Sequence, residues 1–279
     1  MPVPGESQPP SAPGGVARRI QRRHGEIAET VIDQVAEEVP VAMLYNGRAF
    51  AVMMATPCDL EDFALGFSLG EGLIAHAGDL LDVDVHTRVE GIELAMTVSA
   101  DAAGARFRDE SVRELPGRGG CGLCGTRELE NLLHSPAPIA NATRFDAGAL
   151  RRALAALARH QPLNAATGAT HAAAWADAEG RIHRVREDVG RHNALDKLIG
   201  AMTRAGDDPA AGMLLISSRA SYEMVVKAAR AGIGFIAAVS APTALAIELA
   251  RGANLCLVGF ARADGYNVYT FPERLRASP

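Results

Sequence analysis

Cysteine is scarce in this chain, with four among 279 residues, and their spacing is unlike that of a disulfide framework. Such sparse use of cysteine is typical of proteins in a reducing compartment. Long apolar runs are absent too, since none reaches the roughly 18 residues that a membrane-spanning helix needs. The proline-rich start lacks the apolar segment of a secretory signal. We therefore expect a cytoplasmic protein without a membrane partner.

The chain also lacks an excess of positive charge. Its formal net charge is −5, so there is no general footprint for binding nucleic acid. Neither a Walker loop nor a dinucleotide-binding glycine fingerprint is present. Hydrophobic residues make up 48% of the sequence, which is enough for the core of one large or two small domains.

Residues 1–25 are predicted to form a disordered arm, because proline, glycine and serine dominate and no periodicity is visible. Four arginines, at positions 18, 19, 22 and 23, would suit an acidic partner. A solvated tail is the simpler interpretation of the same residues.

Residues 26–116 are predicted to form a small α+β domain. Asn46-Gly47 separates two apolar runs, and this dipeptide favours a type I′ hairpin turn. A second hairpin is expected around Glu90-Gly91. Between the hairpins, Thr56 and Pro57 resemble the start of a helix, with a hydroxyl cap and proline in the first turn. That helix is predicted over residues 60–75.

Two cysteines, Cys121 and Cys124, lie in a glycine-rich stretch that we expect to be a mobile loop over residues 117–126. Five glycines surround them, so the backbone can take conformations that other residues disfavour. Arg118 and Arg127 lie nearby, and positive neighbours lower the pKa of a thiol toward the reactive thiolate. The loop is therefore suited to presenting sulfur.

Several kinds of chemistry fit a CxxC pair. A zinc site needs two further ligands, but Cys58 and Cys256 are isolated, one at a predicted helix start and the other in a predicted buried strand. A thioredoxin-like pair is expected directly after a strand, whereas a loop precedes this one. A sulfur carrier needs only an accessible nucleophilic thiol that can hold a persulfide. The thiols alone do not single out this last possibility.

The last third of the chain predicts a parallel sheet covered on both faces by helices, because short non-alternating apolar runs alternate with helical segments. Ligands of such sheets bind beyond the carboxyl ends of the strands. Those ends are residues 217–219, 240–243 and 259–265, and two of them lead into helix N-termini, which favour phosphate. The sequence thus predicts a phosphorylated, nucleotide-like ligand.

Upstream of this sheet, the block from Asp188 to Lys197 places several polar groups at the start of a helix. Asp188 or Asn193 would serve as an N-cap, and a ligand-binding role is an equally good interpretation. His171 is interpreted as a core histidine, and Tyr222 and Glu223 as residues of a helix surface with a binding role left open.

Together these features resemble the formate dehydrogenase accessory sulfurtransferase family, FdhD. The resemblance covers residues 41–269 in the family's order, and its motifs are Gly120-Cys121-Gly122-Leu123-Cys124-Gly125, the block Glu187–Lys197, Ser217-Ser218-Arg219, and Gly259-Phe260-Ala261-Arg262 with Asn267-Val268-Tyr269. The arginine-containing N-terminal arm is not part of it.

The resemblance implies a cytosolic protein that takes sulfur from a cysteine desulfurase. It implies delivery of that sulfur to the molybdenum of the bis-molybdopterin guanine dinucleotide cofactor, for the catalytic subunit of formate dehydrogenase. Cys121 would be the persulfide carrier and Cys124 an assisting thiol. The implied cofactor-binding residues are Phe260, Ala261, Arg262, Ala263, Asp264 and Gly265.

The resemblance further implies a cytidine deaminase-like three-layer α/β domain over residues 127–279. The CxxC follows Gly120 instead of the proline found in zinc deaminases, so we expect no catalytic metal. Because the cofactor has two guanine dinucleotide halves, we expect a two-fold homodimer. The alternative function is that of a non-catalytic chaperone for the cofactor.

Overall fold

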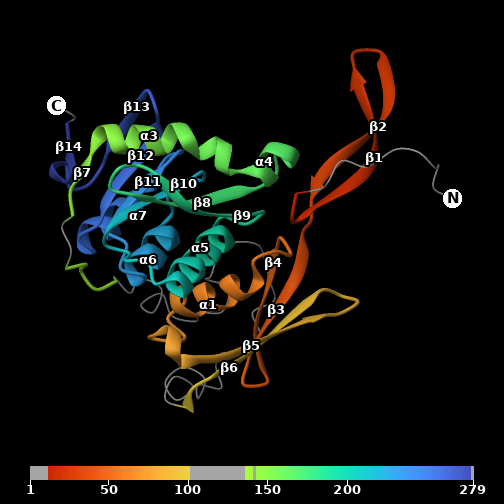
Figure 1. The fold of residues 1–279 in the computed structure, drawn as a ribbon, viewed down its shortest axis with the longest axis horizontal. Coiled ribbons are helices and arrows are strands. Elements are labelled where there is room, and N and C mark those ends of the chain that lie inside the picture. Colours follow the sequence, from red (N-terminus) through yellow and green to blue (C-terminus); the bar gives the residue numbers. More distant parts are fainter. Residues whose placement is uncertain (1–11, 101–135, 141–142, 278–279) are drawn as a thin grey trace.

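The computed structural model describes residues 12–100, 136–140 and 143–277 (Figure 1). The predicted mobile loop over residues 117–126, with Cys121, Cys124 and Arg118, lies outside these ranges, as does the neighbouring Arg127. Among the helices that are described, none combines the length and the apolar character required to cross a membrane.

In the predicted N-terminal arm, residues 15–24 form one strand of a β-hairpin, and residues 1–11 lie outside the described ranges. Strands β1 (Gly15–His24) and β2 (Ile27–Ala36) pair antiparallel over their full length. Gly25 makes the turn with a φ of 61°, a conformation that glycine adopts without strain. The prediction of disorder is therefore wrong for residues 15–24. The first strand has few apolar residues of its own, and it is ordered because β2 pairs with its backbone groups.

A four-stranded sheet follows, with strand order β4-β3-β6-β5. Asn46 and Gly47 have φ values of 48° and 78°, which confirms the type I′ turn. The second predicted hairpin is also present. The strands are β3 (Val39–Tyr45), β4 (Arg48–Ala55), β5 (Leu80–Thr87) and β6 (Ile92–Val98).

Helix α1 (Leu60–Gly70) covers one face of this sheet with its phenylalanines. It is shorter than predicted, and Thr56 is not its cap. Asp59 occupies the N-cap position with a φ of 52° and caps nothing with its side chain. Thr56 is fully buried, and its hydroxyl accepts a hydrogen bond from Val189 N instead. Thr56, which the sequence pattern identifies as a helix cap, therefore makes a long-range contact instead.

The second half of the chain forms a six-stranded mixed sheet of order β13-β12-β11-β10-β8-β9. The three central strands are parallel, as predicted, and the outer strands run antiparallel to their neighbours. The strands are β8 (His171–Asp177), β9 (Ile182–Asp188), β10 (Gly212–Ile216), β11 (Phe235–Ala238), β12 (Cys256–Arg262) and β13 (Gly265–Val268).

Helices cover both faces of this sheet (Figure 1). Successive residues of β10 alternate between two apolar cores: Leu214 and Ile216 pack with α5–α7, and Met213 and Leu215 pack with α3. The result is a three-layer α/β domain. The helices are α3 (Ala147–Leu157), α5 (Arg191–Ala205), α6 (Tyr222–Arg230) and α7 (Ala244–Gly252). Smaller elements are α4 (Pro162–Thr167) and the paired strands β7 (Phe145–Asp146) and β14 (Leu275–Arg276).

Helices α1 and α5 join the two halves of the molecule by an unusually close crossing. A Cβ atom on Gly66 would collide with the carbonyl oxygen of Asp196, and one on Gly200 would collide with that of Asp62. Because glycine stands at both positions, the two backbones approach each other directly. This contact holds the start of α5 in a defined place relative to the N-terminal sheet.

Candidate functional site

The carboxyl ends of the three parallel strands meet along one edge of the sheet, as predicted. Ala220 N donates to Ala241 O at 3.3 Å, and Phe260 N donates to Ser240 O at 3.0 Å. The segments after β10, β11 and β12 are therefore neighbours at the edge where ligands of α/β proteins bind.

Two helix N-termini converge at the β10 end of this edge. Nε2 of His192, in the first turn of α5, lies 2.6 Å from Oε2 of Glu223, in the first turn of α6. The N-cap residues of the two helices are Gly190 and Ser221, and neither gives a side-chain cap. Uncapped N–H groups and the positive end of the helix dipole attract anions. The place is therefore suited to a phosphate or carboxylate.

Two polar atoms at these helix starts are buried without a hydrogen-bond partner among the described residues. They are Nε of Arg191 and Oγ of Ser221. A buried donor without a partner costs about 1–3 kcal/mol, so such atoms require an explanation. An anionic ligand would accept from both, and it would meet the same two helix N-termini.

His171 lies beside this cluster at the start of β8. It is half-buried, so the interpretation as a core histidine is only partly correct. Burial, and then the positive charges of Arg191 and His192, lower the pKa of its imidazole. Next to it, Ala172 N donates to Ser217 Oγ at 2.8 Å. The serine after β10 is therefore tied to the same corner of the sheet.

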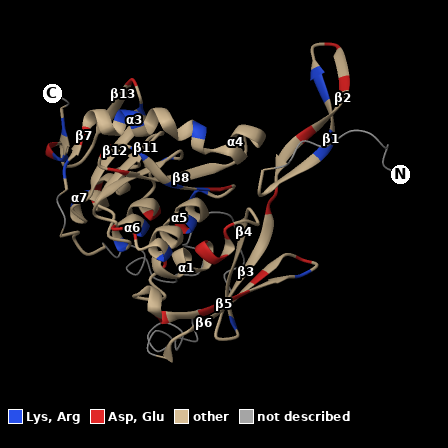
Figure 2. Cartoon of the chain, in the orientation of Figure 1, with Lys and Arg blue, Asp and Glu red and all other residues tan. Residues whose placement is uncertain are grey.

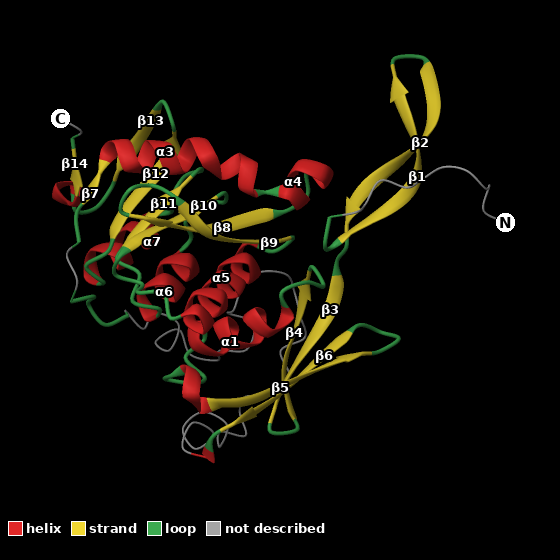
Figure 3. Cartoon of the chain, viewed as in Figure 1, coloured by secondary structure: helices red, strands yellow, loops and turns green. Residues whose placement is uncertain are grey.

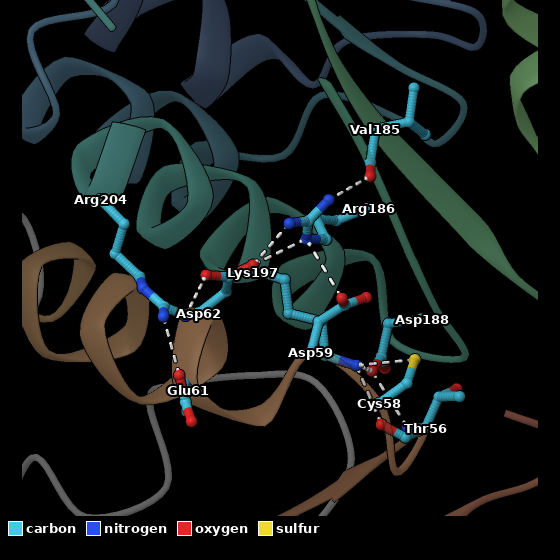
Figure 4. A network of polar contacts seen from close by, with 10 residues as sticks. All are labelled: Thr56, Cys58, Asp59, Glu61, Asp62, Val185, Arg186, Asp188, Lys197 and Arg204. Carbon is cyan, nitrogen blue, oxygen red and sulfur yellow. Dashed lines mark hydrogen bonds and ion pairs between the residues drawn. The ribbon is translucent and has the colours of Figure 1, made fainter. Parts of the chain in front are cut away.

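Asp188 anchors this corner to the N-terminal half of the molecule (Figure 4). Its fully buried carboxylate lies 2.6 Å from Lys197 Nζ and accepts from Thr56 N at 3.0 Å. It also accepts from Asn193 Nδ2 at 2.9 Å, and Asn193 donates further to Met54 O. Neither Asp188 nor Asn193 is the N-cap of α5. Their role is to hold its first turn in position.

Residues 260–265 form the tip of the β12–β13 hairpin, two strands along the same edge from β10. Phe260 has a φ of 50° at a bulge and is 48% exposed. Arg262 and the three residues after it are exposed as well. Ala261 differs, since its side chain is buried in the core under α3. Ala261 is the one buried residue of the predicted cofactor-binding set.

The two cysteines in the described part of the chain lie where burial disfavours the thiolate. Burial raises the pKa of Cys58 to about 11 and that of Cys256 to about 12. Cys256 is a buried small residue, as predicted, while Cys58 is half-buried. No group of three or more potential metal ligands occurs within the described ranges.

Glu223 and Ser221 contribute more to this place than the sequence indicated. Glu223 was expected on a helix surface with a binding role left open, but its side chain is only 12% exposed and pairs with His192. Ser221 was not singled out, and its Oγ is buried without a partner among the described residues. The available signal was their position, because both follow a strand end that leads into a helix. Their partner on α5 is distant in the sequence, and no local pattern identifies it.

Comparison with known proteins agrees with this architecture. The family model for the FdhD/NarQ family matches residues 36–276. A protein from Xanthomonas campestris pv. campestris (strain B100), named sulfur carrier protein FdhD, is 54% identical over 97% of this chain and 96% of its own length. A protein of the same name from Cupriavidus necator is 50% identical over 98% of this chain and 93% of its own.

A crystal structure from Desulfotalea psychrophila, described as that of a formate dehydrogenase accessory protein, has the same fold. Its TM-score is 0.73 at 24% identity, and the match covers 95% of this chain and all of the other. On the family match and the two close relatives, this chain belongs to the FdhD/NarQ family.

Proposed function

We propose that this protein is a sulfur carrier that serves formate dehydrogenase. The observation that carries the proposal is the 54% identity, over 97% of the chain, to a protein named as a sulfur carrier. The chain contains the chemical group that this role needs, the pair Cys121 and Cys124. The described cysteines, with their raised pKa values, are poor candidates for the same role.

The transfer needs one nucleophilic thiolate and no metal of the protein's own. The Cys121 thiolate attacks the outer sulfur of a persulfide on a cysteine desulfurase. The S–S bond of the donor breaks, the donor's cysteine leaves as a thiolate, and Cys121 becomes Cys–S–SH. The S–S bond on Cys121 then breaks as the acceptor takes the outer sulfur atom, and Cys121 leaves as a thiolate, ready for another round, while Cys124 assists as a nearby thiol.

The acceptor in this proposal is the molybdenum of the bis-molybdopterin guanine dinucleotide cofactor. The strand-end site fits its phosphates, because two uncapped helix N-termini and the buried Nε of Arg191 and Oγ of Ser221 meet there. Phe260 and the exposed residues up to Gly265 would contact another part of the nucleotide. The finer fold assignment, a cytidine deaminase-like domain, remains a prediction, as does the cytoplasmic location.

A reconstitution assay separates this function from the alternative of a non-catalytic cofactor chaperone. Formate dehydrogenase would be activated with wild-type protein, a desulfurase and cysteine, and then with Cys121→Ala. A sulfur carrier loses the activation in that variant, whereas a chaperone keeps it. Cys58→Ala is the matched control, since Cys58 is half-buried and has no part in the proposed transfer.

A further inference from the structure

Strand β5 forms one edge of the four-stranded sheet, and its outer side is open. In the strand order β4-β3-β6-β5, no strand of the described residues lies beyond β5 (Figure 3). The strand has 8 residues and contains neither proline nor lysine, two residues with which proteins commonly protect such edges. An edge strand presents a row of unpaired backbone N–H and C=O groups, so β5 can pair with one further strand.

The side chains of β5 alternate between apolar and acidic. Val83 and Val85 lie opposite core residues of β6, on the face of the sheet that α1 covers. Asp82 and Asp84 point to the other face, because successive side chains of a strand alternate, and both are exposed (Figure 2). A strand added to this edge would therefore meet carboxylates on one face and apolar side chains on the other.

Large apolar side chains are exposed along the same edge. Leu81 is 62% exposed and Val85 is 42% exposed, and Val89, in the turn that leads to β6, is 99% exposed. Scattered apolar residues are normal on a protein surface, but a group of them on one edge strand marks a place of interaction.

A second copy of β5 is poorly matched to this edge. Antiparallel pairing of two copies about Val83 would place Asp82 of each directly opposite Asp84 of the other, and like charges at opposite positions are destabilising. A strand with lysine or arginine at every second position would instead place a cation opposite each carboxylate. The charge of the edge therefore selects a basic partner and disfavours self-pairing.

We propose that β5 binds an extended segment of another protein in which basic and apolar residues alternate. The segment adds to the sheet as a fifth strand, with its cations opposite Asp82 and Asp84 and its apolar residues beside Val83 and Val85. In this mode of recognition, main-chain hydrogen bonds give affinity and alternate side chains give specificity. The inference goes beyond the proposed function, because it involves neither sulfur nor cofactor.

Short synthetic peptides, blocked at both ends and labelled with a fluorophore, test the pairing with the full chain. The probe alternates valine and lysine. In fluorescence anisotropy its Kd should be lower by about tenfold or more than that of a peptide that alternates valine and glutamate. It should also bind more tightly than a block peptide with all its valines before its lysines. The block peptide has the same composition, so it controls for general attraction to a chain of net charge −5.

The variant Asp82→Lys/Asp84→Lys should reverse this preference. It should raise the Kd of the valine–lysine peptide about tenfold or more and lower that of the valine–glutamate peptide, because every opposite pair changes sign. The matched control is Glu26→Lys/Glu29→Lys, which changes the same number of charges at exposed positions of the β1–β2 hairpin. Both Kd values should stay unchanged in this control.

Hydrogen exchange locates the added strand. Backbone amides within residues 80–87 should exchange more slowly when the valine–lysine peptide is bound. A probe that does not bind, that binds no better than the block peptide, or that protects another element would overturn the proposal. So would a Kd that is unchanged in Asp82→Lys/Asp84→Lys. Protection of β5 in the protein alone that grows with protein concentration would identify a second copy as the occupant, and would also overturn it.

Discussion

Arg191 and Ser221 each keep a buried polar atom without a partner among the described residues, at the point where α5 and α6 begin. If an anionic nucleotide supplies the missing partner, replacing either residue weakens binding of the isolated nucleotide. We expect Arg191→Met to raise the Kd for guanosine diphosphate about tenfold or more, since a hydrogen bond to a charged group contributes about 1.5–3 kcal/mol. Isothermal titration calorimetry measures the Kd of the variant and of the wild type directly.

The matched control for this experiment is Arg181→Met, at the β8–β9 turn on the opposite edge of the sheet. Arg181 is exposed and pairs with Asp177 and Glu179, so its loss should leave the Kd unchanged. Equal weakening in both variants would mean that binding depends on general charge, and would contradict a site at the two helix N-termini.

Asp196 is a second residue with an unusual environment. Burial, opposed by the Lys227 ammonium and reinforced by Glu71, raises the pKa of its carboxyl from 3.8 to about 6. This carboxyl therefore contributes stability below about pH 4, and the contribution is lost as the pH rises through about 6. In Lys227→Met we expect the pKa to rise further, because burial and Glu71 remain. Carboxyl ¹³C NMR follows the titration, and an unchanged or lower pKa would contradict the assignment.

Among the elements, the crossing of α1 and α5 depends on glycine. Gly200→Ala should destabilise the fold by about 1–3 kcal/mol, the usual cost of forcing an extra carbon into a packed interior. In this case the obstacle is the backbone of Asp62. Urea unfolding measures the difference in unfolding free energy between Gly200→Ala and the wild type. Gly78→Ala is the control, because a Cβ there meets nothing within 4 Å, and a cost equal to that of Gly200→Ala would contradict the explanation.

The elements also show what local pattern can predict. The apolar runs of β10–β12 and the Asn46-Gly47 turn were predictable, because a few adjacent residues determine them. The arm was missed because β1 is ordered by β2, and the cap assigned to Thr56 was wrong because Thr56 contacts Asp188 and Val189, far along the chain. The meeting of His192 with Glu223 depends in the same way on the packing of two helices.

At the scale of the whole molecule, ion pairs around two buried carboxylates, Asp188 and Asp62, connect the two halves. Besides the pair of Lys197 with Asp188, the Asp62 carboxylate binds Arg186 at 2.6 Å and Arg204 at 3.0 Å (Figure 4). Lys197→Met should cost about 3–5 kcal/mol, because it leaves the Asp188 carboxylate buried without its cation. The exposed pair of Arg88 with Glu93 is the comparison, and Arg88→Met should cost at most about 1 kcal/mol. Denaturant unfolding measures the loss of unfolding free energy in each variant. Similar losses in Lys197→Met and Arg88→Met would mean that the buried pair does not hold the two halves together.

The central claim is that the chain carries sulfur on Cys121, and the mass of the intact protein tests it most directly. After incubation with a cysteine desulfurase and cysteine, the wild type should gain about one sulfur atom, which a thiol reductant removes. Cys121→Ala should gain none, while Cys124→Ala tests whether the second thiol is needed for loading. A wild type that gains no sulfur from an active donor, or a Cys121→Ala variant that gains as much as the wild type, would contradict the account.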